Sequence, residues 1–268
     1  MTGAQAWRSH WPEYLCEALG LGLFMVSAGT FGTVIFGTAS PLAGRDPLLA
    51  RFAMGIAMGA TAIAMIYSPW GRRSGGHFNP ATTLTFFRLG KIEAADAAGY
   101  ALAQCVGGVA GVLAVAAFAG RAFTAAPVAA VVTVPGSQGA IAAWLAEIAM
   151  SFGLMTVVLL VGNSTRGARF TGIVAGCLVA FYITFEAPIS GMSMNPARTL
   201  ASALPSGTWT AFWVYLTGPP VGMLAAAELY LRARGHGPRC AKLHHDMEHR
   251  CIFRCGYCIH PSAASSPQ

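Results

Sequence analysis

Hydrophobic residues along this chain occur in long uninterrupted blocks, and polar residues are concentrated between the blocks. No charged residue lies within residues 18–44, 97–120 or 148–165. A helix needs about 20 mainly apolar residues to cross the hydrocarbon core of a bilayer. A soluble protein would need several long helices without a polar face to accommodate such blocks, which is rare. The pattern therefore predicts membrane-spanning helices.

Six segments are long and apolar enough to be complete spans. They cover approximately residues 14–36, 48–68, 94–119, 140–162, 170–188 and 209–231. The first is too long for a cleavable signal peptide, and acidic residues stand where a basic leader would be. The chain is 55% hydrophobic and 10% charged, whereas soluble domains carry about 25% charged residues. We therefore expect an all-α integral membrane protein.

A ten-residue pattern occurs twice and indicates an internal duplication. It reads SGGHFNPATT at residues 74–83 and SGMSMNPART at residues 190–199, with six positions identical. Each copy leads into an apolar run, residues 81–89 and 197–204, that is too short to cross a bilayer alone. A pattern that recurs in both halves of a chain is typical of a repeated structural unit. The two runs therefore predict two half-helices in addition to the six spans.

The order of the spans places the two half-helices on opposite sides of the bilayer. Because three predicted spans separate the copies, one half-helix enters from each face, giving an inverted repeat. In each copy an asparagine, Asn79 or Asn195, is a favourable helix N-cap, and the following proline suits the first helical position. The predicted fold is six transmembrane helices plus two re-entrant half-helices, whose asparagines meet at the midplane. Two helix N-termini meeting there oppose the passage of cations and protons.

The distribution of Lys and Arg predicts the orientation of the chain. With both termini in the cytoplasm, thirteen of the 17 Lys and Arg residues lie inside and three lie outside, with Arg198 set aside as a membrane residue. An excess of basic residues marks the cytoplasmic side. This orientation accounts for the net charge of +7, so no nucleic-acid partner is expected. The expected location is the plasma membrane.

The repeated pattern and the last span resemble a known family. The sequences SGGHFNPA at residues 74–81, NPAR at residues 195–198 and GPPVG at residues 218–222 resemble the aquaporin (major intrinsic protein) family, in its bacterial type. The resemblance covers about residues 11–232. It implies six tilted helices, two half-helices, a separate pore in each protomer, and a homotetramer.

The resemblance also implies a role for individual pore residues. The two asparagines would orient permeating molecules, and Arg198 would stand in a narrow outer constriction with Met58, Ile183 and Met192. An arginine at that depth is costly unless it faces a wet lumen, where it can donate hydrogen bonds and repel cations. Water-selective relatives resemble one another in having an aromatic ring and a histidine at this constriction, and glycerol facilitators in having a glycine and two aromatic rings. The three apolar residues here depart from both patterns.

The function implied is a passive channel for water, not an enzyme. Glycerol, ammonia, peroxide and uncharged metalloid acids are alternative permeants. A coupled secondary transporter is a further alternative, although it would need acidic groups at mid-membrane. Only Glu17 and Glu147 are candidates, and the resemblance implies that both accept hydrogen bonds from the re-entrant loops. His77 is expected at the pore mouth, either in the wall or as a gate that titrates near neutral pH.

The two halves of the channel are predicted at residues 1–120 and 121–232. Residues 233–268 follow them as a basic tail, which we expect in the cytoplasm. The tail holds four of the seven cysteines, and cytoplasmic thiols stay reduced, which favours metal binding over disulfides.

Cys255 and Cys258 in this tail have the spacing of a structural zinc site. Cys251 and His260, with His249 as an alternative ligand, would complete it. The channel itself requires no cofactor, so zinc or another soft metal in the tail is the only one expected. The alternatives are incidental thiols in a basic tail and a channel gated by metal binding.

Overall fold

The computed structural model describes residues 2–257. Within these residues the chain is helical and contains no strand. The long helices are α1 (Gly3–Phe36), α2 (Pro47–Tyr67), α5 (Ala94–Ala119), α7 (Gly139–Gly162), α8 (Thr171–Phe185) and α11 (Phe212–Arg234). The short ones are α3 (Pro69–Ser74), α4 (Pro80–Arg88), α6 (Arg121–Thr124), η1 (Ala129–Val131), η2 (Ala168–Phe170), α9 (Ala187–Ser190) and α10 (Pro196–Ser206).

The six long helices correspond to the six predicted spans. Among the described residues, five helices are apolar enough to cross a membrane by length and composition alone, with α8 counted from Ala168. The sixth, α11, has 23 residues and is therefore about 34 Å long, which suffices for the hydrocarbon core. Its two prolines and Glu228 make it less apolar than the others. The all-helical fold class predicted from the sequence is confirmed.

Helix α1 begins at Gly3, well before the predicted start of the first span at residue 14. Thr2 caps the helix through a reciprocal capping box with Gln5. The extra turns continue past the apolar block because they find polar partners on α5. His10 Nδ1 lies 2.7 Å from a carboxylate oxygen of Asp96, and the Tyr14 hydroxyl donates to the same oxygen at 2.6 Å.

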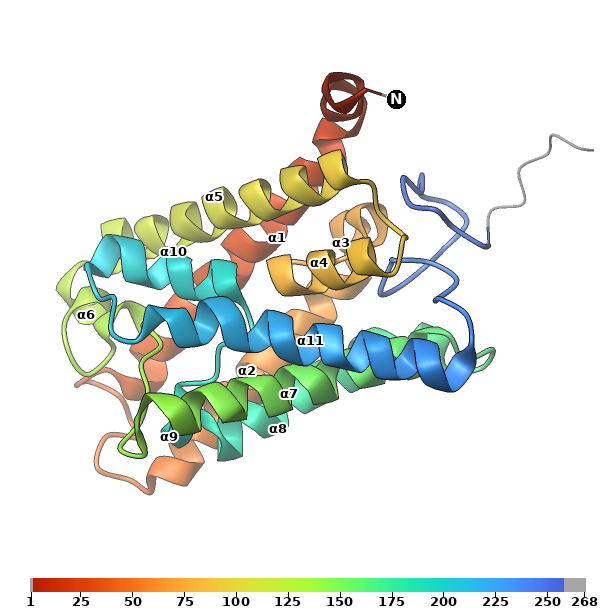
Figure 1. The fold of residues 1–268 in the computed structure, drawn as a ribbon. Coiled ribbons are helices and arrows are strands. Elements are labelled where there is room, and N and C mark those ends of the chain that lie inside the picture. The colour runs from red at the N-terminus through yellow and green to blue at the C-terminus, as the bar shows by residue number, and fades with distance from the viewer. Residues whose placement is uncertain (1, 258–268) are drawn as a thin grey trace, which may run out of the picture.

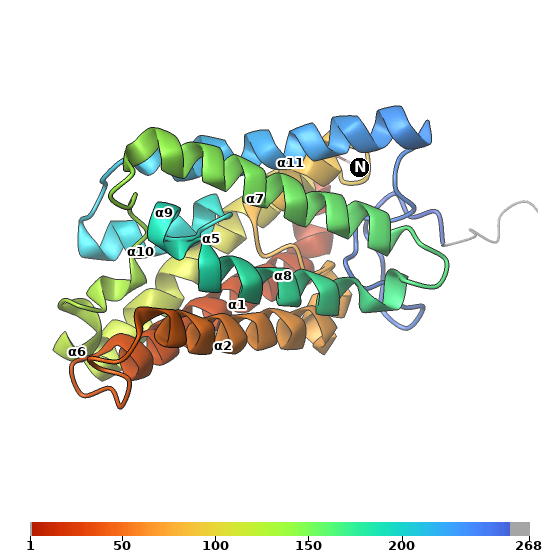
Figure 2. The ribbon, with the colours of Figure 1, turned by 90° about the horizontal axis from the view of Figure 1, so that it is seen from below.

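Three pairs of long helices form the bundle and reflect the internal duplication. Helix α1 packs along α5, and its counterpart in the second half is α7 packed along α11, while α2 packs along α8 across the two halves (Figures 1 and 2). A Cβ added at Gly107 of α5 would overlap the Ala18 carbonyl of α1, and one at Gly222 of α11 would overlap the Ile148 carbonyl of α7. Small residues at crossings allow close backbone approach in lipid.

The two half-helices, α4 and α10, lie end to end between α5 and α11 (Figure 1). Each is preceded by a short helix, α3 or α9, that ends at a glycine in the left-handed region. These glycines are Gly75, with φ 100°, and Gly191, with φ 79°. Glycine adopts this conformation without steric cost, so it turns the chain sharply before each Asn-Pro pair. The prediction of two half-helices at the repeated pattern is confirmed.

Residues 235–257, which follow α11, contain no helix or strand. This segment, which we call the tail segment, folds back against one end of the bundle beside α3 and α4 (Figure 1). This position is important because a cavity that runs through the bundle has one of its mouths at the same end.

Candidate pore

Asn79 and Asn195 meet at the junction of the two half-helices through a reciprocal pair of hydrogen bonds. Asn79 Nδ2 donates to the Met194 carbonyl at 2.7 Å, and Asn195 Nδ2 donates to the Phe78 carbonyl at 2.8 Å. Each side-chain oxygen meanwhile caps its own half-helix, accepting from the Ala81 or the Ala197 N–H. The duplicated sequence therefore produces a nearly symmetric contact between its two copies.

The residue before each asparagine adopts a strained backbone conformation. Phe78 has φ 47° and Met194 has φ 51°, a left-handed geometry that is uncommon for residues with a side chain. The carbonyl groups of these two residues are the acceptors for the opposite asparagine. Strain of this kind persists only where surrounding contacts enforce it, and it often marks a functional site.

Glu17, on α1, supplies those contacts for the first loop. Its carboxylate accepts hydrogen bonds from the backbone N–H of His77 at 3.1 Å and of Phe78 at 2.6 Å, and from the Ser74 hydroxyl at 2.6 Å. The side chain is completely buried. A buried carboxylate is tolerated only when hydrogen-bond donors surround it, so Glu17 and the loop fix each other.

Glu147, on α7, repeats this arrangement in the second half. It accepts from the N–H of Ser193 at 2.8 Å and of Met194 at 2.7 Å, and from the Ser190 hydroxyl at 2.8 Å. It too is completely buried. The geometry agrees with the prediction that both glutamates anchor re-entrant loops.

Two buried tyrosines complete the loop anchors and were not predicted from the sequence. The Tyr100 hydroxyl donates to the Ser74 carbonyl at 2.6 Å, and the Tyr215 hydroxyl donates to the Ser190 carbonyl at 2.5 Å. The tyrosines follow their serines by 26 and 25 residues. This near-equal spacing from the repeated pattern is the signal that could have identified them.

A single cavity of about 300 Å³ runs through the bundle past the junction of the half-helices. It extends from Phe36 and Arg51 at one end to Ile66 and Leu243 at the other. All the predicted pore residues line it, namely Met58, His77, Asn79, Ile183, Met192, Asn195 and Arg198. Glu17 and Glu147 stand behind the loops, outside this lining.

Arg198 is the charged group of the predicted constriction, whose other members, Met58, Ile183 and Met192, line the same cavity. Its backbone N–H donates to the side chain of Asn195 at 3.2 Å, which holds it in the first turn of α10. Its Nη1 atom is buried and has no hydrogen-bond partner within residues 2–257. A guanidinium nitrogen is only a donor, and Arg198 is one of the residues that line the cavity.

His77 lines the cavity at the end nearest the tail segment, and both of its ring nitrogens and both of its ring faces are in contact with other residues. Its Nδ1 lies 3.0 Å from the Thr83 hydroxyl, and its Nε2 lies 2.9 Å from the Ala241 carbonyl of the tail segment. The ring is stacked between Phe86, at 5.1 Å, and Phe253, at 5.5 Å. It is therefore part of the wall where the tail segment meets the loop.

The tail segment brings together a set of metal-ligating side chains different from the predicted one. One ligand atom each from Cys240, His245, Cys251 and Cys255 lies within 4.8 Å of the others. The Cys240 and Cys251 sulfurs share a hydrogen bond at 3.6 Å, and this contact lowers the pKa of the Cys251 thiol below its ordinary value. Of the predicted ligands, Cys251 and Cys255 belong to this cluster. The other two predicted ligands, Cys258 and His260, lie outside the described residues.

Comparisons with known proteins agree with this architecture. The sequence model of the family described as major intrinsic protein matches residues 4–230. The chain belongs to this family. It is 32% identical to glycerol uptake facilitator protein-like 6 of Lactiplantibacillus plantarum, over 80% of this chain and 94% of that protein. It is 38% identical to aquaporin NIP1-4 of Oryza sativa subsp. japonica, over 69% of this chain and 66% of that protein.

The fold also matches a solved structure, the X-ray structure of the aquaglyceroporin from Plasmodium falciparum. The TM-score is 0.67, with 21% sequence identity over 82% of this chain and 95% of that one. The resemblance to the aquaporin family is therefore confirmed. The protein is a multi-pass membrane protein with the architecture of a passive channel.

Proposed function

We propose that the protein conducts water and small uncharged solutes passively through the central cavity. The observation that carries this proposal is that both asparagines and Arg198 offer hydrogen-bond donors to one continuous cavity. An amide nitrogen has two N–H groups. Within the described residues, Asn79 Nδ2 and Asn195 Nδ2 each use one of them on the opposite loop. The second is left to orient a molecule that passes.

The remaining wall favours neutral permeants over ions. Met58, Ile183 and Met192 face the cavity together with Arg198, so the constriction offers no carboxylate to replace the hydration shell of a cation. The guanidinium charge and the N-termini of α4 and α10 repel cations further. Both glutamates are buried behind the loops, and no carboxylate is among the described residues that line the cavity, which favours a channel over a coupled transporter.

Solutes larger than water form the second candidate class. The apolar constriction residues include two methionines, whose unbranched side chains adapt their shape to what is next to them. A polyol such as glycerol presents hydroxyl groups that Arg198 and the asparagines would bind and C–H groups that the methionines would contact. We infer that glycerol passes along with water.

The assembly and orientation follow from the family resemblance and the charge distribution. Both termini and the tail segment are assigned to the cytoplasmic side, where basic residues are concentrated. Four copies would form a homotetramer with one pore in each, which a native mass of four chains in detergent would test. We assign the protein to the plasma membrane.

Stopped-flow light scattering on proteoliposomes tests the permeant. The full-length protein is reconstituted after removal of metal with a chelator and exposed first to an impermeant osmolyte and then to glycerol. We expect fast shrinkage in both cases and re-swelling only in glycerol. Shrinkage without re-swelling would restrict the function to water, and rates equal to those of empty liposomes would contradict the proposal.

Arg198→Ala tests the constriction in the same assay. Removing the guanidinium widens the opening and removes a cation barrier, so we expect several-fold faster glycerol entry and a measurable leak of protons in a pH-dye assay. Arg121→Ala serves as the control, because Arg121 is exposed on α6 and outside the cavity. If both variants and the unchanged protein had equal permeabilities, Arg198 would not be part of the constriction.

A further inference from the structure

The tail segment occupies the mouth of the cavity at its own end of the bundle. The backbone N–H of Leu243 donates to the Gly75 carbonyl at 2.9 Å, and the Leu243 side chain lines the cavity. Ala241, completely buried, presents its carbonyl to His77 Nε2 at 2.9 Å. The segment is thus bonded directly to the re-entrant loop that precedes Asn79.

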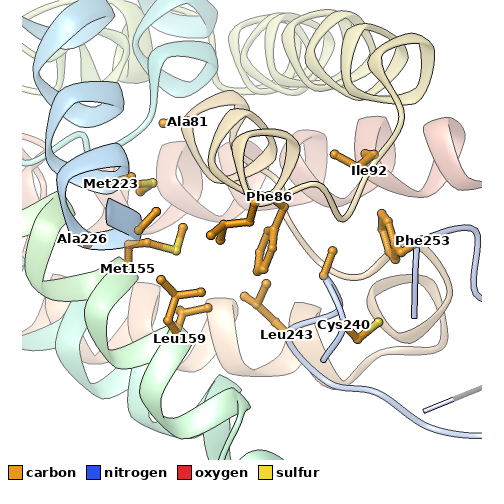
Figure 3. Close-up of a cluster of buried hydrophobic side chains, with 14 of the residues drawn as sticks. Ala81, Phe86, Ile92, Met155, Leu159, Met223, Ala226, Cys240, Leu243 and Phe253 are labelled. Atoms are coloured by element: carbon orange, nitrogen blue, oxygen red, sulfur yellow. The ribbon is translucent and has the colours of Figure 1, made fainter. Parts of the chain in front are cut away.

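Apolar contacts seal the same junction. Leu243, Cys240 and Phe253 of the tail segment belong to one buried cluster with Phe86 of α4 (Figure 3). The Phe253 ring is nearly parallel to that of His77, with an angle of 16° between the planes. Leu243 of this packed segment is part of the cavity lining, so water leaving the cavity at this end would pass against the tail segment.

The cluster of Cys240, His245, Cys251 and Cys255 lies within this same folded segment and has the spacing of a tetrahedral metal centre. The sulfurs of Cys240 and Cys251 are 3.6 Å apart, and Cys255 Sγ lies 3.1 Å from His245 Nε2. Zinc–sulfur bonds of about 2.3 Å in a tetrahedron separate two sulfurs by about 3.8 Å. The two sulfurs are too far apart for a disulfide, whose bond is about 2.05 Å long.

We propose that Cys240, His245, Cys251 and Cys255 bind a zinc ion or a similar soft divalent metal, and that this ion holds the tail segment in the mouth of the pore as a closed gate. Three thiolates and one imidazole are a common donor set of structural zinc sites. The part of the proposal that concerns gating rests on the proposed channel function. The part that concerns metal binding does not.

The sequence of the tail segment explains why a metal would be needed. Residues 235–257 form no helix or strand, so few internal backbone hydrogen bonds stabilise the segment against unfolding. Short chains without a sizeable core usually depend on a metal or a disulfide for stability. In such chains the free energy of metal binding contributes directly to folding. Loss of the ion would therefore free the segment from the mouth.

Groups around the cluster favour the thiolate form of cysteine that binds a metal, and a second cavity lies beside the cluster. The Tyr257 backbone N–H donates to the Cys255 sulfur at 3.4 Å, and the Tyr257 ring lies 4.8 Å from that of His245. The positive charge of Lys242 contributes to lowering the pKa of the Cys251 thiol. A second cavity of about 340 Å³ lies beside the cluster and is lined by Cys240, His245 and Arg169.

Metal binding is tested on the full-length protein without any flux measurement. The purified protein is stripped with a chelator, reloaded with zinc, and analysed for metal content. We expect one ion per chain, reduced to the background level in a Cys251→Ser, Cys255→Ser double variant and unchanged in Cys177→Ser, whose thiol is exposed on α8. Cobalt in place of zinc should give the visible absorption of a tetrahedral thiolate site. Absence of bound metal would overturn the proposal.

Gating is tested by comparing the water permeability of proteoliposomes made from zinc-loaded and metal-stripped protein. We expect the zinc-loaded form to be several-fold slower, and the double variant to be fast with or without zinc. Equal rates with one zinc bound would refute the gate while leaving the metal site. If the permeation rate responded to an oxidant and not to metal, the tail segment would be held by a Cys240–Cys251 disulfide, and the metal proposal would be overturned. Slow permeation in every form, the stripped one included, would count against the proposed channel function instead.

Discussion

At the scale of single residues, the two glutamates that anchor the re-entrant loops are buried at a high cost in free energy. Glu17 and Glu147 are completely buried, and a buried charge without hydrogen-bond donors costs several kcal/mol. Each carboxylate therefore binds two consecutive backbone N–H groups and a serine hydroxyl. The same contacts hold Phe78 and Met194 in left-handed conformations and direct their carbonyls toward the asparagines.

Replacement of Glu147 by glutamine should destabilise the second loop. The amide nitrogen of glutamine would replace one acceptor oxygen and face an N–H donor, leaving a buried group unsatisfied. We expect the free energy of unfolding to fall by about 1–3 kcal/mol, measured by thermal denaturation in detergent with tryptophan fluorescence.

The matched control for this variant is Glu228→Gln. Glu228 pairs with Arg88 at 2.7 Å, but both side chains are partly exposed, and such pairs contribute only about 0–1 kcal/mol. If both variants unfold at the temperature of the unchanged protein, Glu147 has no anchoring role.

At the scale of elements, the bundle depends on backbones that approach closely at helix crossings. Gly107 of α5 faces the Ala18 carbonyl of α1, and Gly59 of α2 faces the Gly176 carbonyl of α8, where an added Cβ would lie 2.6 Å from the oxygen. Side chains at these positions would separate the helices that enclose the cavity. The spacing of the helices around the cavity thus depends on glycines that are not part of its lining.

Gly107→Val should disrupt the packing of α1 against α5. The added side chain meets backbone that cannot move aside, and overpacking of this kind costs about 1–3 kcal/mol. We expect a lower melting temperature and more aggregate in size-exclusion chromatography. Ala110→Val, on the exposed face of the same helix, adds comparable bulk toward lipid and should leave both measurements unchanged. A Gly107 variant as stable as that control would show that the crossing tolerates a side chain.

At the scale of the whole molecule, the two halves of the chain enclose one cavity, and the tail segment is packed against one of its mouths. Arg254 of the tail segment pairs with Glu93 at 2.6 Å, and Arg250 donates to the Ser9 carbonyl at 3.1 Å. These contacts reach the α4–α5 loop and the start of α1. Because the tail segment and the N-terminal turns of α1 are in contact, they lie on the same side of the membrane.

Reporter fusions test that side. A fluorescent protein fused after residue 268 should be fluorescent in a bacterial host, and alkaline phosphatase at the same place should be inactive, because the basic side stays in the cytoplasm. Phosphatase fused after Gln138, in the loop before α7, should be active. Active phosphatase at the C-terminus would reverse the orientation and place the tail segment at the outer mouth.

The sequence by itself determined the membrane-spanning class, the duplication and the position of both half-helices. These features are recorded locally: uncharged blocks of span length, an N-cap asparagine before a proline, and a repeat whose two copies must pack alike. A carboxylate inside an apolar block requires a partner or a function, and the family resemblance supplied the loop-anchoring role of the two glutamates. The pore residues 58, 183, 192 and 198 were predicted from their spacing in the family, and the fold brings all of them to one cavity.

Only the tertiary structure decided where the tail segment lies and which of its described cysteines gather together. Cys240 and His245 lie 11 and 10 residues before their partners Cys251 and Cys255. In a chain without regular structure, spacing in sequence does not determine distance in space, so the local Cys-x-x-Cys pattern gave no indication of Cys240 or His245. The contact of Leu243 with Gly75 joins residues 168 positions apart in sequence. Such long-range contacts result from packing of the complete fold and leave no periodic signal in the sequence.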